Sequence, residues 1–425
     1  MSAPPLRILF VAYRGNMQCG GQGVYLWFLA RELARMGHAV DVLVGPPYPD
    51  AMPFARVEEL PNQRYWGKWF LRDARRFLPE PEPLRVFEPL QFYELAASRL
   101  GFLPEPFAFS VRAFRALGRR LRAGARYDVV HDVQCLGWGL LGVRALGLPV
   151  LSTVHHPLTV DRRASFARDR DLASAVGTMQ FYPIGMQRAV ARRLDRILTS
   201  SSASAAEIAR DFHVRPERLA MVGNGLDTEL FSPDPSVPRS PSEILCVGRA
   251  SDPNKGIANL IEALALLPPP TRLVLVDDDH AGHEGRRRAR TLGCADRLDV
   301  VGRVPTERLV ELYRRAALVV VPSRYEGFGL PAAEAMACAT PVVATAAGAL
   351  PEVVRAGGGG LLVPRDDPQA LAKAIASLLE QPDTRRALGA RGRERIRAAF
   401  AWPVVAARTA QVYRDVLAER AAARR

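Results

Sequence analysis

Short apolar runs alternate with helical patterns along the first half of the chain. Leu26, Leu29, Ala30 and Leu33 recur at helical spacing, and Gly37 is a natural stop for that helix. Strands that alternate with helices predict a parallel sheet covered by helices on both faces. The predicted strands are residues 6–11, 39–45, 127–133, 149–155, 196–201 and 219–225.

A proline-rich segment then interrupts the alternation. Residues 232–241 contain four prolines and no core pattern, which is typical of a linker. After it the pattern restarts, with predicted strands at 244–249, 272–277, 297–303, 317–323 and 341–345. The predicted fold class is therefore α/β, with two doubly wound, Rossmann-like domains that face an interdomain cleft. Because ligands bind outside the carboxyl ends of the strands in such sheets, this cleft is the predicted site.

The linker divides the chain into predicted domains. The N-terminal domain is expected at 1–231 and the C-terminal domain at 242–400. Residues 401–425 are expected to form a helix that crosses back to the first domain.

Charge narrows the kinds of partner. The 425 residues carry a net charge of +14, which favours a nucleoside diphosphate, an anionic lipid surface or nucleic acid. No nucleic-acid-binding signature accompanies the charge, so nucleic acid is not expected. Only three of the 58 basic residues are lysines, so Lys255, in a turn before a glycine, stands out.

Cysteine usage and hydropathy bear on location. No apolar run approaches the length of a membrane span, and the five cysteines are scattered without a CxxC pair. We therefore predict a cytoplasmic protein in a reducing compartment, with no disulfide framework and no zinc site.

The segment "YEGFGLPAAEA" (325–335) carries the most specific chemistry. It follows the predicted strand 317–323, so Glu326 falls at a carboxyl edge, and Pro331 suits the first position of a helix that also contains Glu334. The glycines free backbone amides to approach a ligand beside the positive end of the helix dipole. Such a loop suits an anionic, polyhydroxylated ligand. A hydrolase would need carboxyl groups on opposite sides of a glycosidic bond, which one loop and its helix do not easily supply.

Several motifs in order carry a family resemblance. The segment "PSRYEGFGLPAAEAMACATPVVAT" (322–345) resembles the signature of family 4 retaining glycosyltransferases of the GT-B fold. Further matching segments are "GNMQCGGQGVYLWFLARELARMGHAVDVL", "STVHH", "VGNGLDTELFSP", "VGRASDPNKG", "GGGGLLVPRDDPQALAKAI" and "FAWPVVAARTAQVY". The resemblance implies transfer of a hexosyl group from a nucleoside-diphosphate sugar to an alcohol acceptor, with retained configuration, no bound metal and no cofactor. The acceptor would be a glycan, a lipid or a small molecule, with a lipid-linked or cell-surface glycan among the candidates. The N-terminal domain would lie on the acceptor side, and the C-terminal domain would bind the nucleotide sugar.

The resemblance also implies roles for matching positions. Glu326 would lie by the donor sugar, Arg249 and Lys255 would clamp the diphosphate, and His155 would contact the sugar near its reacting carbon. Fixed cations and oriented amides would stabilise the charge that builds on the leaving nucleoside diphosphate, and domain closure would assemble them. The other implied donor-binding residues are Gly20, Gly21, Gly327, Phe328, Gly329, Leu330 and Glu334, the last of which would hold the ribose.

Plainer interpretations stand beside these roles. Acidic residues near a helix start are common for dipole reasons alone, most cations lie on surfaces, and the neighbouring His156 leaves open which imidazole faces the cleft. Asp277, Asp278 and Asp279 stand where the family often has glycines, and Ala339 stands where it commonly has one.

Two alternative functions follow. The three aspartates could bind a divalent cation, as the DxD motif does in a different, metal-dependent glycosyltransferase fold. The protein could also be a non-catalytic, membrane-associated protein that binds sugar nucleotides.

Residues 51–106 form an atypical insertion in the first domain. Within its segment 64–94, Trp66, Trp69, Phe70 and Phe77 would lie toward one side of a helix, with cations largely elsewhere. This pattern suits a segment that lies on an anionic membrane, peripherally on the inner face of the cell membrane. A lid that packs its aromatic side chains on the first domain is the favoured alternative.

Overall fold

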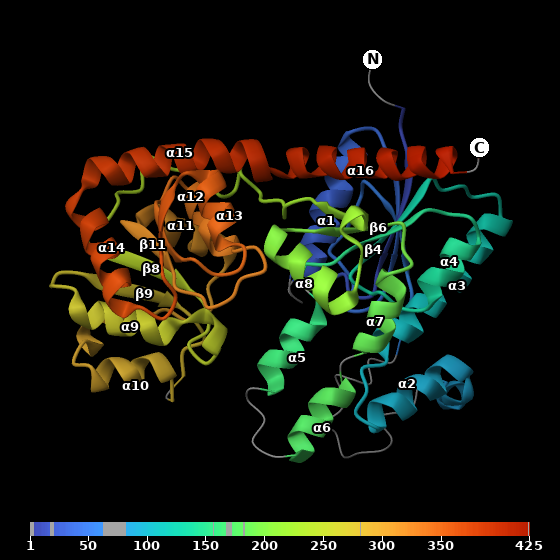
Figure 1. Ribbon diagram of the computed structural model, residues 1–425, viewed down its shortest axis with the longest axis horizontal. Helices are drawn as coiled ribbons and strands as arrows, with labels where there is room; N and C mark the ends of the chain where they lie inside the picture. Colours follow the sequence, from blue (N-terminus) through green and yellow to red (C-terminus); the bar gives the residue numbers. More distant parts are fainter. Residues whose placement is uncertain are drawn as a thin grey trace. The chain divides into compact units, whose positions relative to one another are not determined.

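The computed structural model describes residues 4–17, 21–62, 82–155, 157–166, 172–181, 183–280, 282–423 and 425. These residues form two compact units (Figure 1). The first contains residues up to Ser200, Ser204–Val222 and Ala406–Arg425, and the second contains Ser201–Ala203 and Gly223–Val405. Gly20, His156 and the aromatic residues Trp66, Trp69, Phe70 and Phe77 lie outside the described residues.

The described strands of the first unit form one parallel sheet in the order β3-β2-β1-β4-β5-β6-β7. The strands are β1 (Arg7–Ala12), β2 (Ala39–Val44), β3 (Arg56–Glu59), β4 (Val129–Val133), β5 (Val150–Thr153), β6 (Arg196–Thr199) and β7 (Leu219–Met221). The helices are α1 (Gly21–Arg35), α2 (Pro89–Arg99), α3 (Glu105–Arg122), α4 (Gly139–Ala145), α5 (Leu158–Phe166), α6 (Leu172–Phe181), α7 (Ile184–Ala191) and α8 (Ser202–Phe212), with short 3-10 helices η3 (Pro83–Phe87) and η4 (Pro216–Arg218).

The sheet of the first unit is buried on both faces. Val11, Val130 and Ile197 point into a core built with α3, α4, α7 and α8. His131, next to Val130, points the other way, where its Nδ1 lies 2.5 Å from the Tyr413 hydroxyl of α16 (Trp402–Ala422). Burial, with a smaller contribution from the charge of His155, lowers the pKa of His131 to about 3, so its ring is neutral near pH 7.

The second unit has its own parallel sheet, in the order β10-β9-β8-β11-β12-β13. The strands are β8 (Glu243–Val247), β9 (Arg272–Val276), β10 (Leu298–Val300), β11 (Leu318–Val321), β12 (Val342–Thr345) and β13 (Gly360–Val363). The helices are α9 (Ile257–Leu266), α10 (Glu284–Thr291), α11 (Thr306–Arg315), α12 (Leu330–Ala337), α13 (Leu350–Gly357), α14 (Pro368–Glu380) and α15 (Pro382–Phe400), with 3-10 helices η5 (Pro253–Lys255) and η6 (Ala295–Arg297).

Helices cover both faces of this second sheet (Figure 1). Alternate strand residues explain why: Ile244 and Val320 pack with α9, α10 and α14, whereas Leu245 and Val319 pack with α11, α12, α13 and α15. Because the strand side chains on both faces of the sheet are apolar, each strand is a continuous apolar run in the sequence. The predicted α/β fold with two doubly wound sheets is confirmed.

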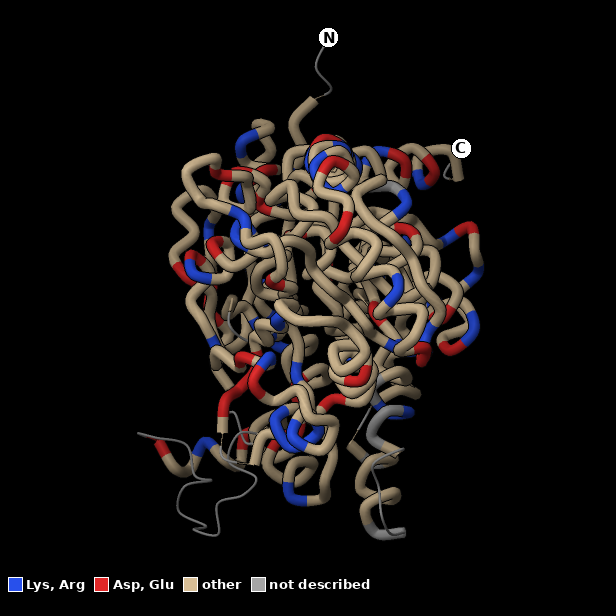
Figure 2. Tube along the Cα trace, turned by 90° about the vertical axis from the view of Figure 1, so that its left-hand side faces the viewer, with Lys and Arg blue, Asp and Glu red and all other residues tan. Residues whose placement is uncertain are grey.

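Charged residues of both signs are interspersed along the trace (Figure 2). The net charge of +14 is therefore a sum over interspersed residues of both signs, and electrostatic arguments depend on local pairing.

Candidate functional site

The strand order of the second unit places its ligand crevice between β8 and β11. These two strands are neighbours, while β9 follows β8 on one side and β12 follows β11 on the other. In a doubly wound sheet, ligands bind at the carboxyl ends of the strands where the order reverses in this way. The loops after β8 and β11 hold Arg249, Lys255 and Glu326, so three of the predicted site residues meet at this point.

Lys255 and Glu326 are bound directly to each other. The Lys255 Nζ lies 2.7 Å from the Glu326 Oε1, and the Ser323 hydroxyl donates to the same oxygen at 2.9 Å. The lysine side chain is 29% exposed and the glutamate 12%, so the pair is shielded but reachable. The sequence predicted both residues for the site, but it did not show that they pair.

Local capping fixes the lysine at this position. The Asp252 carboxylate accepts from the Asn254 amide at 3.0 Å and caps η5, which ends at Lys255. Gly256 follows in the left-handed region, with φ 63°, and a Cβ there would lie 2.0 Å from the Pro322 carbonyl oxygen. Only glycine allows the β8 loop to lie this close to the β11 loop.

The pair keeps capacity for a ligand. Among the described residues, both hydrogen bonds to the Glu326 carboxylate go to Oε1, so Oε2 has no side-chain partner there. The Lys255 ammonium has three N–H donors and uses one on Glu326. An anion could therefore bind the lysine while a hydroxyl binds the glutamate.

The second predicted carboxylate, Glu334, lies in α12 and accepts from the Tyr313 hydroxyl at 2.7 Å. Glu334 keeps some exposed surface. Its carboxyl nevertheless lies deep enough that burial raises its pKa to about 7, against a smaller lowering by the Tyr313 hydrogen bond. Glu334 thus changes charge near neutral pH.

The turn between the two glutamates differs from expectation in one detail. Helix α12 begins at Leu330, so Pro331 is its second residue rather than its first, because Gly329 with φ 93° serves as the N-cap. The Phe328 side chain is buried against Phe400, with ring centroids 5.2 Å apart, and belongs to the core. Only the backbone of Phe328 is therefore a candidate for ligand contact.

Arg249 lies in the same loop as Lys255 and is exposed. Its guanidinium makes no ion pair with any residue that the structure describes. Its charge helps to lower the pKa of Asp278, after the larger effect of Arg303. Arg249 is thus a cation available to a ligand.

Asp277 supports this loop from the neighbouring strand end. Its Oδ2 accepts from the Ala250 amide at 2.7 Å and lies 2.9 Å from the His283 Nε2. The other ring nitrogen of His283 accepts from the Arg286 amide at 3.3 Å, which indicates a neutral ring protonated on Nε2. Asp277 is therefore a structural acceptor beneath the loop.

The next two aspartates bind separate arginines. Asp278 pairs with Arg303, with Oδ2 2.8 Å from Nη2, and both oxygens of Asp279 lie 3.1 Å from Arg286. Within the described ranges, no group of three or more His, Cys, Asp or Glu side chains is arranged to hold a metal ion. Asp277, Asp278 and Asp279 therefore each bind a different side chain.

In the first unit, His155 follows β5. Its amide donates to the Gln134 side chain at 3.0 Å, and its ring meets Tyr25 edge-on with centroids 4.9 Å apart. The Tyr25 hydroxyl lies 3.0 Å from the Thr153 hydroxyl, which also lies 2.7 Å from the His131 Nε2. The buried tyrosine therefore orients the histidine, a role that the sequence did not reveal.

Gly21 and Gly23 of the "CGGQG" motif lie in α1. Gly21 is the first residue of this helix and is exposed. Gly23 is the glycine with a steric role, because a Cβ there would lie 2.2 Å from the Asn16 carbonyl oxygen. Gly21 thus gives an exposed helix start, and Gly23 allows a close backbone approach.

Two family models match the chain in sequence. The model described as "Glycosyl transferase 4-like domain" matches residues 20–225, and the model "Glycosyl transferases group 1" matches residues 227–395. Among known proteins, the MMP alpha-(1->4)-mannosyltransferase of Mycolicibacterium hassiacum is 39% identical over 98% of this chain and 100% of that protein. The D-inositol 3-phosphate glycosyltransferase of Thermobispora bispora is 30% identical over 95% of this chain and 91% of that protein.

Solved structures show the same architecture. Sucrose-phosphate synthase from Thermosynechococcus elongatus superimposes with a TM-score of 0.69 at 27% identity, covering 97% of this chain and 100% of that one. HepE of Anabaena in complex with UDP gives a TM-score of 0.67 at 20% identity, covering 96% and 100%. The second likeness is one of fold alone. The predicted GT-B fold is confirmed.

Gly348, in the loop after β12, offers a test of how tightly Glu326 is held. It has φ 52°, and a Cβ there would lie 2.2 Å from the Glu326 carbonyl oxygen. Gly358 has a similar φ of 57° but open space around it. We predict that Gly358→Ala costs about 1 kcal/mol of unfolding free energy, the left-handed penalty alone. Gly348→Ala should cost roughly 2 kcal/mol more, because backbone must move. Urea unfolding of both variants measures the two changes in unfolding free energy. Equal losses would show that the loop that carries Glu326 can shift without an energetic cost.

Proposed function

The chain belongs to the group 1 glycosyl transferases, of the family 4 type, and we propose that it transfers a hexosyl group from a nucleoside-diphosphate sugar to an alcohol acceptor. The observation that carries this proposal is the Lys255–Glu326–Ser323 cluster at the β8/β11 crevice. It offers a cation for phosphate and a carboxylate oxygen for a sugar hydroxyl at the place where this fold binds ligands.

The donor contacts follow from the charges of the loops. Lys255 supplies a compact cation and Arg249 a second, planar one, which together suit the two phosphates. The start of α12, with the amides of Gly327, Phe328, Gly329 and Leu330, adds oriented dipoles. We assign Glu326 to the transferred sugar and Glu334 to the ribose.

We further propose contacts from the first unit. His155 would contact the transferred sugar near its reacting carbon, and the amides of Gly20 and Gly21 would contact a phosphate. The fixed ring of His155 against Tyr25 supports a positioning contact.

The relatives suggest the sugar. The M. hassiacum protein, 39% identical along its whole length, is named as an alpha-(1->4)-mannosyltransferase. We therefore propose mannose as the first sugar to test, and a glycan or polyol hydroxyl as the acceptor. A phosphorylated polyol is a second acceptor class, because the relative from T. bispora is named for D-inositol 3-phosphate.

The proposed reaction retains the anomeric configuration and requires no metal. Departure of the nucleoside diphosphate places negative charge on its phosphates, where Lys255, Arg249 and the α12 dipole stabilise it. A phosphate oxygen of the leaving group takes the proton of the acceptor hydroxyl as the new bond forms on the same face. Glu326 is bound to Lys255 through Oε1. This arrangement suits a role in binding sugar hydroxyls better than it suits a role as a covalent nucleophile.

The two alternatives remain distinguishable. A metal-dependent reaction would need Asp277–Asp279 to converge, whereas these residues bind His283, Arg303 and Arg286 separately. A non-catalytic protein would bind the donor through the same Lys255 and Glu326, but it would not transfer the sugar.

The test is a transfer assay with UDP-, GDP- and ADP-linked mannose and glucose, run with and without excess chelator. We predict that Lys255→Ala and Glu326→Ala each lower kcat at least about a hundredfold, the scale of losing one preorganised electrostatic contact. Lys255→Arg should also lower kcat, because a guanidinium favours contact with both oxygens of Glu326 and would occupy the Oε2 proposed to bind the sugar. Lys373→Ala, an exposed lysine of α14, is the matched control and should have no effect.

The outcomes separate the alternatives. Near-normal turnover in either alanine variant would contradict its assigned role. Loss of activity in chelator would favour the metal-dependent alternative, and binding of donors without any transfer would favour the non-catalytic one. The anomeric configuration of the product, measured by NMR, tests retention.

The pKa of Glu334 predicts a pH dependence for donor binding. Burial raises this pKa to about 7, so lowering the pH through 7 protonates the carboxylate that would accept the ribose hydroxyls. The Kd of a nucleotide sugar should therefore rise below pH 7, by up to about tenfold per pH unit, and stay flat above it. In Glu334→Gln this slope should vanish. Calorimetric titrations from pH 5.5 to 8.5 check it, and an unchanged slope in Glu334→Gln would remove the ribose assignment.

Peripheral membrane association of a cytoplasmic protein is a separate proposal. None of the helices in the described part of the chain has both the length and the apolarity to cross a bilayer. Within the described part of segment 64–94, the side chains of Leu84 and Phe87 on η3 are 80% and 72% exposed, and Phe92 on α2 is 56% exposed. Exposed apolar side chains support contact with a membrane surface, although Arg85, the one cation of residues 82–94, is paired with Glu82 and Glu88.

Sedimentation with anionic vesicles tests this surface. We predict that the protein binds at low salt and that Leu84→Ser/Phe87→Ser reduces the bound fraction severalfold. Leu266→Ser, at a residue 56% exposed in the second unit, should not. No sedimentation of the unmodified protein at low salt would end the proposal.

A further inference from the structure

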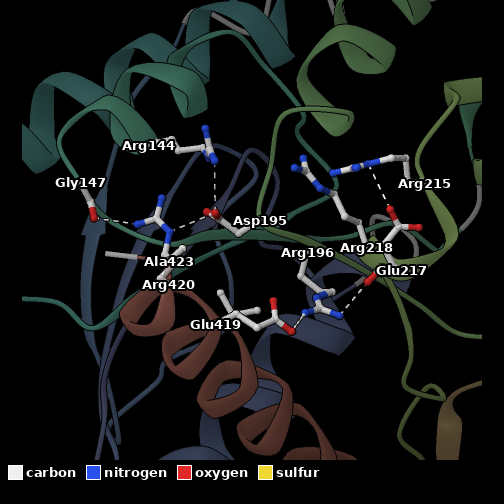
Figure 3. A pocket seen from close by; sticks show the side chains of 11 residues that line it. Arg144, Gly147, Asp195, Arg196, Arg215, Glu217, Arg218, Glu419, Arg420 and Ala423 are labelled. Carbon is white, nitrogen blue, oxygen red and sulfur yellow. Dashed lines mark hydrogen bonds and ion pairs between the residues drawn. The ribbon is translucent and has the colours of Figure 1, made fainter. Parts of the chain in front are cut away.

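A second charged site lies in the first unit, away from the carboxyl ends of its strands. A pocket of about 600 Å³ is lined by Arg144, Asp195, Arg196, Arg215, Arg218 and Arg420, among others (Figure 3). Arg196 is the first residue of β6, and the Asp195 amide donates to the Val150 carbonyl at the start of β5. This arginine pocket is therefore at the amino ends of the strands, opposite the edge that carries His155 and Gly21.

The pocket holds more positive than negative charge. Its lining contains five arginines and three carboxylates, an excess of two positive charges. Asp195 is shared, since it lies 3.1 Å from Arg420 and 3.4 Å from Arg144 while also accepting from the Val150 amide at 2.9 Å. One carboxylate thus serves two guanidinium groups.

The remaining pairs leave further charge uncompensated. Glu419 pairs with Arg196, and Glu217 lies 3.2 Å from Arg215. Arg218 has no carboxylate partner among the residues that the structure describes, and it donates to the carbonyl oxygens of Arg192 and Leu194. Its full charge is therefore open to an anion.

Arg144 is also only partly compensated. Its contact to Asp195 is long, and its Nε is buried without a hydrogen-bond acceptor in the described residues. In the view of Figure 3, the guanidinium groups of Arg144, Arg215 and Arg218 lie on the side of the pocket away from α16. An anion on that side also avoids the partial negative charge at the carboxyl end of α16.

We propose that the arginine pocket binds a compact phosphate-bearing anion, a phosphomonoester or diphosphate, distinct from the donor. The excess of two positive charges matches a phosphate dianion. A guanidinium group can also donate two parallel hydrogen bonds to two oxygens of one phosphate. A volume of about 600 Å³ lies within the range of small-molecule sites. The ligand would bridge Arg144 of α4 and the arginines Arg215 and Arg218 of the segment that precedes β7.

Calorimetric titration of the full-length protein with inorganic pyrophosphate at low salt tests the site. Because pyrophosphate would also compete for the donor clamp, the titration is repeated in Lys255→Ala. We expect binding to persist in Lys255→Ala and to weaken at least about tenfold in Arg144→Gln/Arg218→Gln. Arg287→Gln/Arg290→Gln removes the same charge from exposed positions of α10 and should bind as the unmodified protein does.

Several results would overturn the proposal. These are no binding of the unmodified protein at low salt either to pyrophosphate or to vesicles that contain phosphatidic acid, binding lost in Lys255→Ala alone, or equal affinity in the two double variants. If Arg144→Gln/Arg218→Gln does not fold, as judged by circular dichroism, Arg215→Gln replaces it, because Arg215 is exposed and should weaken binding severalfold on its own. Vesicles that contain phosphatidic acid form a parallel arm. Binding to vesicles but not to pyrophosphate, with the same dependence on arginine, would identify a lipid headgroup as the source of the phosphate.

Discussion

The proposed donor site depends on how closely three loops of the second unit approach one another. Gly256, after β8, lies against the Pro322 carbonyl, and Gly348, after β12, lies against the Glu326 carbonyl. Both glycines have left-handed backbone angles, φ 63° and 52°. The β11 loop is thus held from both sides by backbone contacts that no side chain could replace. Because this loop carries Glu326, its position is set before any ligand binds.

This packing has an electrostatic consequence. Lys255 and Glu326 are brought together in a partly shielded place, where each is the other's nearest opposite charge. The carboxylate holds the ammonium in position and offsets the cost of its partial burial. A donor phosphate would then meet a cation whose position is already fixed, so little side-chain entropy remains to be lost on binding. The Asp277 carboxylate acts similarly one loop away, since it fixes the Ala250 amide next to Arg249.

Periodicity and motifs predicted the sheets well but not the contacts between loops. The apolar runs located the central strands, because parallel strands that are buried on both faces consist of consecutive apolar residues. The edge strands β3 and β13 were missed, since "RVEE" and "GLLV" are short and lie at sheet margins where burial is partial.

The Lys255–Glu326 pair joins residues 71 positions apart, and no local pattern encodes such a contact. The aspartates 277–279 show the same limit, because their partners His283, Arg303 and Arg286 are defined only by the fold. The family's glycine preference at 339 does have a local cause, namely that Ala339 adopts φ 56°.

The use of lysine at 255, in a chain with few lysines, follows from the geometry. The side chain runs past Gly248, where a Cβ would lie 3.5 Å from the Lys255 Cγ, and ends 2.7 Å from the Glu326 Oε1. A guanidinium would extend further and, being planar, would favour a two-oxygen contact with the carboxylate. Such a contact would occupy Oε2 as well as Oε1, and Oε2 is the oxygen proposed to bind the sugar. A point charge that uses a single carboxylate oxygen leaves the other for the substrate. The choice of cation and the proposed role of the glutamate therefore depend on each other.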